Sequence, residues 1–163
     1  MWKDHAIATA EVLNKINPHF IRLRSLRIPQ RVPLSKEINE GQFVMQDEDM
    51  VVEELKLFIE NIEGIKSRVT SDHMMNLLEE IEGRLSEDKK KMLDVIDRYQ
   101  SLSDADRLIF RVGRRGGAYS STYDLENDPA VYSRIKNLIH ELEKKGGTEG
   151  VENFITEMVD RYI

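Results

Sequence analysis

The sequence predicts a helix-dominated α/β fold, with an alternating first half and an all-helical second half. Two observations lead to this prediction. The patterns along the chain follow the order helix, strand, helix, strand and then about five helices. Two strands rarely form an independently stable sheet unless helices cover them. We therefore expect the first half to be part of a larger parallel α/β structure.

The first predicted strand, His19–Pro29, raises the main functional question of the sequence. Successive side chains of a strand point to opposite faces. One face includes two arginines and consists of Phe20, Arg22, Arg24 and Leu26. The other face is suited to packing against helices, and it consists of Ile21, Leu23 and Ser25. Arg22 and Arg24 must then face either water or a polar cavity that supplies anions.

The rest of the first half shows helix signals and one further strand pattern. Apolar spacing predicts a helix over Lys3–Ile16, and Asp47 caps a second helix that runs to about Glu63. One or two helical turns are expected over residues 34–39. A weaker alternation predicts a strand over Ile65–Ser71, and a short amphipathic helix should follow over Met74–Leu85.

The second half contains helices with clear capping signals. Ser86 should cap a helix to about Leu102, and the Ser103–Asp106 capping box should open a helix that ends at Gly116-Gly117. Asp128-Pro129 begins a helix that runs to Gly146-Gly147, and Thr148 caps the last one. Its apolar stripe is Val151, Phe154, Ile155, Met158, Val159 and Tyr162.

Composition excludes several classes of function. The 163 residues are 40% hydrophobic and 33% charged, which suits a single globular domain. A net charge of -6 argues against nucleic-acid binding, and the lack of a long apolar run argues against a membrane span. Cysteine is absent, which excludes thiolate metal sites and fits a cytoplasmic protein. No two of the four histidines have helical i, i+4 spacing, so we expect no metal site.

Several runs of residues between Lys3 and about Tyr123 share a pattern with a known family. The first run is Lys3-Asp4-His5-Ala6 through Glu11-Val12-Leu13-Asn14, then Ile16-Asn17-Pro18-His19-Phe20 to Leu26, Pro33-Leu34 and the helix capped by Asp47. The others are Ser71-Asp72-His73 with Asn76-Leu77-Leu78 to Gly83, and Phe110-Arg111-Val112-Gly113-Arg114-Arg115. These runs resemble the later part of a radical SAM barrel, in the group of iron-sulfur oxidoreductases related in barrel design to the oxygen-independent coproporphyrinogen oxidases.

This resemblance implies two strands of a partial parallel (β/α) barrel in residues 1–85 and a helical accessory region, packed on it, in residues 86–163. The alternative is that the two parts form one domain. In that family an amino-terminal cysteine triplet holds a [4Fe-4S] cluster that cleaves S-adenosylmethionine. This sequence has no such triplet. By resemblance it is the carboxyl-terminal portion of such an oxidoreductase. It contains no cofactor itself and is inactive alone, and both cofactors belong to the full-length parent.

In such a barrel, Arg22 and Arg24 would hold a carboxylate or phosphate of a cofactor or substrate. Asp72 and His73, at the carboxyl end of the second strand, would orient a substrate or move a proton. Alternatively, the arginines pair with Asp72 and other acids and contribute only to structure. A weaker anion site consists of Arg111, Arg114 and Arg115. This run is also typical of a plain helix end.

Two other functions stay open. One is a non-enzymatic helical interaction module, whose basic patch binds a protein or an anionic partner. The other is a small-molecule enzyme, which lacks any nucleophile or metal to support it. For the oxidoreductase portion we expect the partner to be the missing amino-terminal half of the barrel or a second copy. An isolated fragment exposes an apolar surface that self-association buries.

Overall fold

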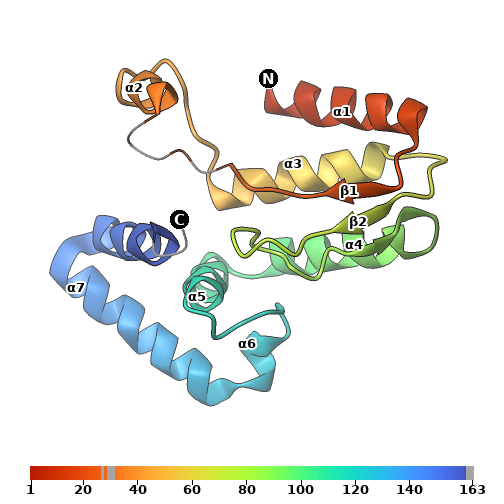
Figure 1. Cartoon of the computed structure of the whole chain (residues 1–163). Helices are drawn as coiled ribbons and strands as arrows, with labels where there is room; N and C mark the ends of the chain where they lie inside the picture. Colours follow the sequence, from red (N-terminus) through yellow and green to blue (C-terminus); the bar gives the residue numbers. More distant parts are fainter. Residues whose placement is uncertain (27, 29–31, 161–163) are drawn as a thin grey trace. The chain divides into compact units, whose positions relative to one another are not determined.

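The computed structural model describes residues 1–26, 28 and 32–160, which form two compact units (Figure 1). Unit 1 consists of Met1–Asn76 with Ile81–Leu93. Unit 2 consists of Leu77–Glu80 with the described residues from Asp94 onward. The predicted helix-dominated α/β class is confirmed. The strands of the described residues form a small mixed sheet, so the barrel stays a prediction.

The sheet of unit 1 has the strand order β1-β2-β3. β1 (Phe20–Arg22) runs parallel to β2 (Arg68–Thr70), which pairs antiparallel with β3 (Gly83–Arg84). The parallel pair fits the sequence prediction, whereas the antiparallel third strand was not predicted. Val69 of β2 is fully buried and Ile21 of β1 nearly so, which places the covered face of the sheet in the core of unit 1.

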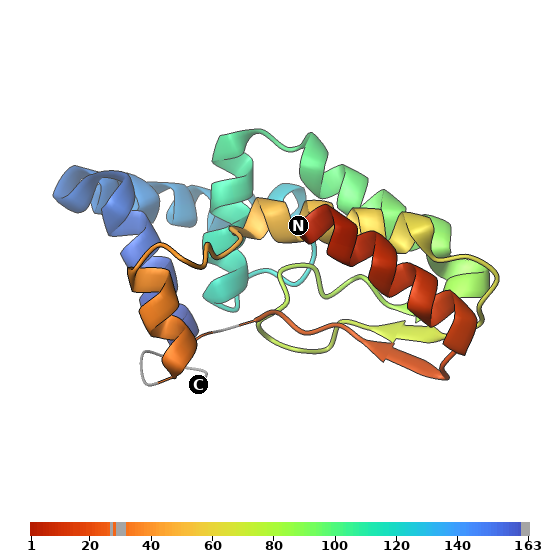
Figure 2. The ribbon, with the colours of Figure 1, turned by 90° about the horizontal axis from the view of Figure 1, so that it is seen from above.

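Two helices cover one side of this sheet. α1 (Trp2–Ile16) packs against α3 (Glu48–Asn61), and Figure 2 shows both on the same side of β1 and β2. α1 ends as predicted at Asn17, whose φ of 48° is left-handed. The Asp47 side chain caps α3 by accepting from the backbone N–H of Met50 at 2.7 Å. α2 (Pro33–Asn39) forms the predicted short helix.

The predicted helix over Met74–Leu85 is wrong. Turns and loop occupy the stretch up to Glu82, β3 follows, and α4 (Leu85–Ser101) begins where the predicted helix should end. Gly83 has a φ of 135°, a conformation that no right-handed helix contains and that glycine adopts readily. The apolar spacing of this stretch therefore reflects the burial of side chains within a loop and not one face of a helix.

Both strands are shorter than the sequence predicts. β1 was expected over His19–Pro29, but pairing extends only as far as the Leu23 N–H, which donates to the Thr70 carbonyl at 2.9 Å. β2 ends at Thr70, so the residues that follow Leu23 have no backbone hydrogen-bonding partner on β2. The end of the predicted strand lies outside the described residues, which do not include 27 and 29–31. Two basic residues, Arg27 and Arg31, are among these.

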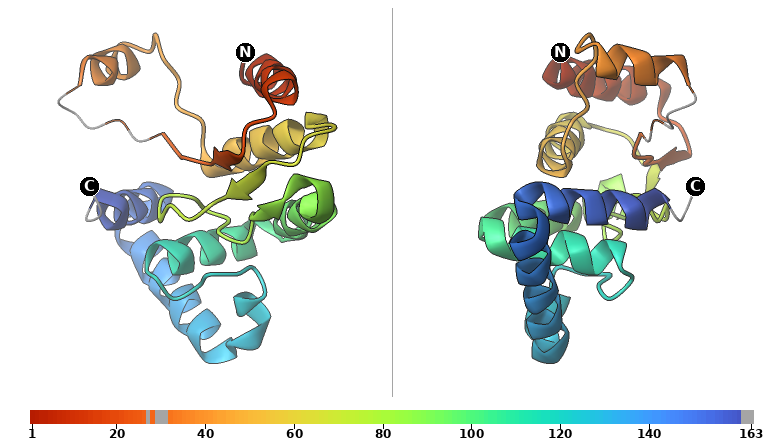
Figure 3. Two further views of the ribbon diagram at one scale, coloured as in Figure 1. Left: turned by 45° about the vertical axis from the view of Figure 1, so that its right-hand side comes forward. Right: turned by 90° about the vertical axis from the view of Figure 1, so that its left-hand side faces the viewer.

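Unit 2 is helical. It contains the part of α4 from Asp94 onward, α5 (Asp104–Arg115), α6 (Asp124–Asn127) and α7 (Pro129–Asp160). Two predicted caps are present: the Ser103 hydroxyl accepts from the Asp106 N–H at 3.1 Å, and Gly116 follows the end of α5. The predicted Ser86 cap is wrong, because α4 already begins at Leu85. α7 bends at Gly147, with a φ of 62°, where the sequence predicts a break between two helices (Figure 3). α6 was not predicted, and Tyr162 lies outside the described residues.

Candidate functional site

The parallel pairing of β1 and β2 places their carboxyl ends at the same edge of the sheet. The four main candidates of the sequence analysis lie at or just beyond that edge, all within unit 1. They are Arg22, Arg24, Asp72 and His73. Open α/β sheets bind ligands at the carboxyl ends of their strands.

Arg22 and Asp72 form a two-pronged ion pair across this edge. The guanidinium donates from Nε to Oδ1 at 2.9 Å and from Nη2 to Oδ2 at 2.8 Å. These hydrogen bonds hold the pKa of the Asp72 carboxyl below its ordinary value, and the positive charge of Arg24 adds to this effect. Both partners are 53% exposed, so the pair lies in solvent, whereas the sequence analysis left an enclosed polar cavity open.

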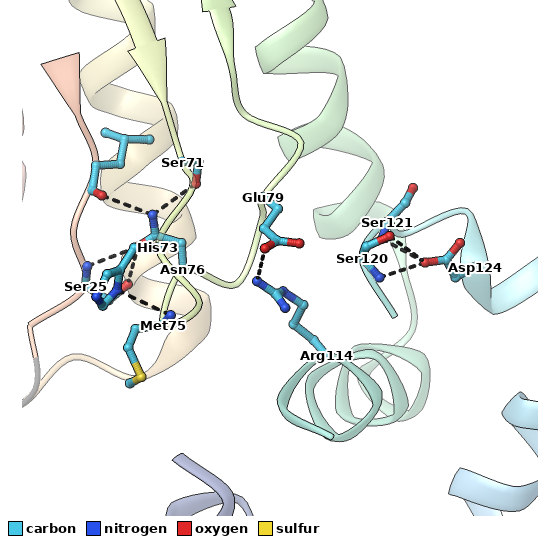
Figure 4. Close-up of polar contacts among 11 residues, drawn as sticks. Ser25, Ser71, His73, Met75, Asn76, Glu79, Arg114, Ser120, Ser121 and Asp124 are labelled. Atoms are coloured by element: carbon cyan, nitrogen blue, oxygen red, sulfur yellow. Dashed lines mark hydrogen bonds and ion pairs between the residues drawn. The ribbon is translucent and has the colours of Figure 1, made fainter. Parts of the chain in front are cut away.

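Asn76 joins the segments that follow the two strands, as Figure 4 shows. Its Oδ1 accepts from the backbone N–H and the hydroxyl of Ser25, each at 3.1 Å. Its Nδ2 donates to the Leu23 carbonyl and to the Ser71 hydroxyl, again at 3.1 Å. Asn76 is 6% exposed and Ser71 1% exposed. This buried amide therefore fixes the edge on which the candidates lie.

Sequence reasoning missed Asn76 because the residue lies inside the stretch that was predicted to be helical. Asparagine is unfavourable in helix interiors, since its side chain competes for backbone partners. That property was the available signal against the helix. Ser25 and Leu23, two of the residues that its amide contacts, lie 51 and 53 residues away in sequence, which no local pattern reveals.

His73 and Arg24 are less constrained than the ion pair. The Nδ1 of His73 accepts from the Met75 N–H at a long 3.4 Å, and its carbonyl accepts from the Asn76 N–H at 2.8 Å. The Arg24 side chain is exposed and makes no ion pair or hydrogen bond with any residue that the structure describes. A proton donor or acceptor and one uncommitted guanidinium are thus present at the edge.

The weaker anion-site candidates lie on α5 in unit 2. Arg114, which is 8% exposed, pairs with Glu79 at 2.9 Å (Figure 4). Arg111 pairs with Glu152 at 3.0 Å, and Arg115 is 7% exposed. Carboxylates already neutralise two of these cations, and burial restricts ligand access to Arg114 and Arg115.

Acidic side chains of unit 2 hold loops in place. Glu80 accepts from the Ser121 hydroxyl at 2.8 Å and from the Thr122 N–H at 3.1 Å. Asp124 accepts from the N–H groups of Ser120 and Ser121 at 2.8 and 2.9 Å. The Glu80 contacts and the Arg114–Glu79 pair fasten residues 77–80 within unit 2. The Glu80 and Asp124 carboxylates therefore hold the backbone of the loop before α6 in place.

The residues of this chain do not fit an iron-sulfur cluster. Such clusters are held by cysteine thiolates, and the sequence contains no cysteine. Among residues 1–26, 28 and 32–160, no group of three or more histidine and acidic side chains is arranged to hold a metal ion. Within the same residues, no helix combines the length and apolar character needed to cross a membrane.

No protein-family model matches the chain, and no curated protein or solved structure matches it. The geometry of the edge and the sequence resemblance therefore carry the functional argument.

Proposed function

We propose that this chain is the carboxyl-terminal portion of a cytoplasmic radical SAM iron-sulfur oxidoreductase, and that it is inactive alone. The observation that carries this proposal is the parallel β1–β2 pair, whose connection runs through α2 and α3 and whose carboxyl ends are joined by Arg22 and Asp72. A parallel pair with a helical crossover is the repeating unit of a (β/α) barrel. The runs of residues that resemble this family pass through the same elements.

In this proposal the edge contributes residues on the substrate side. Arg24 and, when released from Asp72, Arg22 hold a carboxylate or phosphate group of a substrate or cofactor. Asp72 and His73 orient the substrate or accept a proton. The cluster and S-adenosylmethionine belong to a cysteine-bearing part of the parent protein. No step of their chemistry is assigned to residues of this chain.

The test begins with the reading frame upstream of Met1. An in-frame Cys-x-x-x-Cys-x-x-Cys run is expected there, and the joined protein should bind a [4Fe-4S] cluster after anaerobic reconstitution. With a reductant it should cleave S-adenosylmethionine to 5′-deoxyadenosine, whereas this chain alone should do neither. A joined protein that binds no cluster, or an upstream frame without the triplet, contradicts the proposal.

Arg22→Met and Arg24→Met in the joined protein test the assignment of the edge. If the arginines bind substrate, the double variant keeps the cluster and loses turnover of the bound substrate, while its folding stability falls only a little because the Arg22–Asp72 pair is exposed. Arg134→Met, at an exposed arginine of α7, is the matched control. If the double variant and the Arg134→Met control lose turnover equally, Arg22 and Arg24 do not bind the substrate.

A second candidate is a non-enzymatic interaction module with a basic anion-binding patch. The exposure of Arg24, together with that of Ile16 (63%) and Phe20 (68%), favours it. Such a module binds its partner without any cluster-bearing segment. A stable complex between this chain and an acidic partner protein, weakened by Arg24→Met, would favour it over the oxidoreductase portion.

A further inference from the structure

Figure 2 shows no described helix of unit 1 against the side of the sheet opposite α1 and α3. Several exposed basic side chains project to this side. Burial alternates strictly along β2 and the residues beside it. The buried members are Ile65, Ser67, Val69 and Ser71. The other side chains point the opposite way, and three of them, Lys66, Arg68 and Asp72, are exposed. No residue that the structure describes covers Lys66 or Arg68 enough to bury it.

The register of the sheet lines up three side chains on this open face. Phe20 of β1 lies opposite Arg68 of β2, and Arg68 lies opposite Arg84 of β3. Directly opposite residues project to the same face, and neighbouring strands lie about 4.8 Å apart. Phe20 is 68% exposed, and both arginines are exposed. An aromatic ring and two guanidiniums therefore form one row across the sheet, which we call the Phe20–Arg68–Arg84 row.

Two acids lie beside this row without pairing with its guanidiniums: Glu82, two residues before Arg84, and Asp88, which accepts from the Arg84 backbone N–H at 2.7 Å. Neither guanidinium makes an ion pair or hydrogen bond with another described residue, and the carboxylate of nearby Glu82 also makes none. Asp72, another exposed acid of the same face, is paired with Arg22. Like charges directly opposite each other on a sheet are destabilising. Folding stability alone therefore gives no reason for two arginines here, whereas an anionic ligand does.

We propose that the Phe20–Arg68–Arg84 row binds a phosphate monoester attached to a planar ring, such as a nucleoside monophosphate. A phosphate dianion matches two guanidiniums in charge and offers several acceptor oxygens. Lys66, two residues before Arg68 on the same face, adds to the attraction. The exposed ring of Phe20, next to Arg68 in the row, offers a surface for stacking.

The charge of the whole chain favours a small ligand over a nucleic acid. The net charge is -6, and binding to a polymer of phosphates requires many cations to replace its counterions. The row supplies local positive charge for one or two phosphate groups. This inference goes beyond the proposed function and does not depend on it, because the row lies entirely in this chain.

The test uses the whole chain with adenosine monophosphate, inorganic phosphate and adenosine at one ionic strength, since salt screens exposed charges. Adenosine monophosphate should bind more tightly than phosphate, and adenosine should not bind measurably. Arg68→Gln and Arg84→Gln should each weaken nucleotide binding roughly tenfold or more. Phe20→Ala should weaken binding of the nucleotide but not of phosphate. Arg134→Gln, at an exposed arginine of α7, should change nothing.

Thermal unfolding without ligand separates binding from a structural role. Removing either arginine relieves the like-charge repulsion, so the Tm of Arg68→Gln and Arg84→Gln should stay the same or rise. A lower Tm in both variants, or nucleotide binding unchanged from that of Arg134→Gln, overturns the proposal. A single-stranded oligonucleotide that binds far more tightly than the mononucleotide overturns the choice of a small ligand. None of these results depends on an iron-sulfur cluster, so failure here leaves the oxidoreductase proposal to its own test.

Discussion

Asn76 accepts two hydrogen bonds from Ser25, one from the backbone N–H and one from the hydroxyl, each at 3.1 Å. The two residues follow the carboxyl ends of β2 and β1 respectively. Regular pairing between these strands stops at Leu23. Beyond this point the side chain of Asn76 replaces the backbone hydrogen bonds between the strands, and it holds the two segments together at the candidate site.

The first prediction concerns this amide. Asn76→Ala removes four hydrogen bonds and leaves the nearly buried Ser71 hydroxyl without this donor. Each buried polar group that loses its partner costs about 1–3 kcal/mol, so we expect a loss of stability of at least that size. Urea unfolding measures it. Asn137→Ala, at an exposed position of α7, is the matched control and should change stability little. Equal effects of the two substitutions would show that Asn76 is not a structural link.

The second prediction concerns the pKa of Asp72, which Arg22 lowers from its ordinary value of 3.8. Because the folded-state pKa is depressed, the contribution of this pair to stability is complete above pH 3.8 and is lost as the pH falls through the lowered value. Arg22→Met should move the Asp72 titration midpoint upward. NMR of the carboxyl carbon measures it. Arg134→Met should leave the midpoint unchanged, and an unshifted midpoint in Arg22→Met would exclude the ion pair in solution.

Local signals in the sequence were enough to predict most of the helix ends. Asp47 and Ser103 cap helices through hydrogen bonds to the N–H three residues later, and Gly147 bends α7 where a break was predicted. Each of these features depends on neighbours in sequence. The alternation of buried and exposed residues around β2 also depends only on the local period of a strand.

Features that depend on distant contacts could not be predicted in this way. The stretch Met74–Leu85 has helical apolar spacing, yet the positive φ of Gly83 and the long-range bonds of Asn76 make it a loop and a strand. The pairing of Arg22 with Asp72 was one of the alternatives, because parallel strands bring their ends together. The alignment of Arg68 with Arg84 requires the register of a two-residue strand, which the sequence does not specify.

The third prediction concerns packing in unit 2. A Cβ at Gly113 would lie 2.2 Å from Cδ2 of Tyr119 and 2.9 Å from Cδ1 of Ile135. The Tyr119 ring is 2% exposed and stacks on Phe110 with ring centroids 6.2 Å apart, so it has no room to move. Gly113→Ala should therefore destabilise the protein by about 1–3 kcal/mol.

Gly146 provides the matched control for this substitution. A Cβ there meets no atom within 4 Å, and alanine is the better helix former. Gly146→Ala should leave stability unchanged or raise it by up to about 1 kcal/mol. Thermal unfolding of both variants checks the pair of predictions. Equal stability of Gly113→Ala and the unmodified protein would contradict the close approach of Tyr119.

The last prediction concerns self-association at the edge of the sheet. β1 pairs with β2 on one side, and no described strand pairs with its other side, which leaves backbone N–H and C=O groups open to another chain. Ile16, the last residue of α1 and four residues before β1, is 63% exposed. We expect the mass measured by size-exclusion chromatography with light scattering to rise with protein concentration.

Ile16→Lys tests whether this surface drives the association. A lysine at a helix carboxyl end is favourable for the helix, so the fold should persist while the apolar contact is lost. The variant should shift towards the monomer. Val44→Lys introduces the same charge at a side chain that is 81% exposed in the connection between α2 and α3, and it should associate like the unmodified protein. A monomer at every concentration would exclude self-association and leave a different polypeptide as the partner of β1.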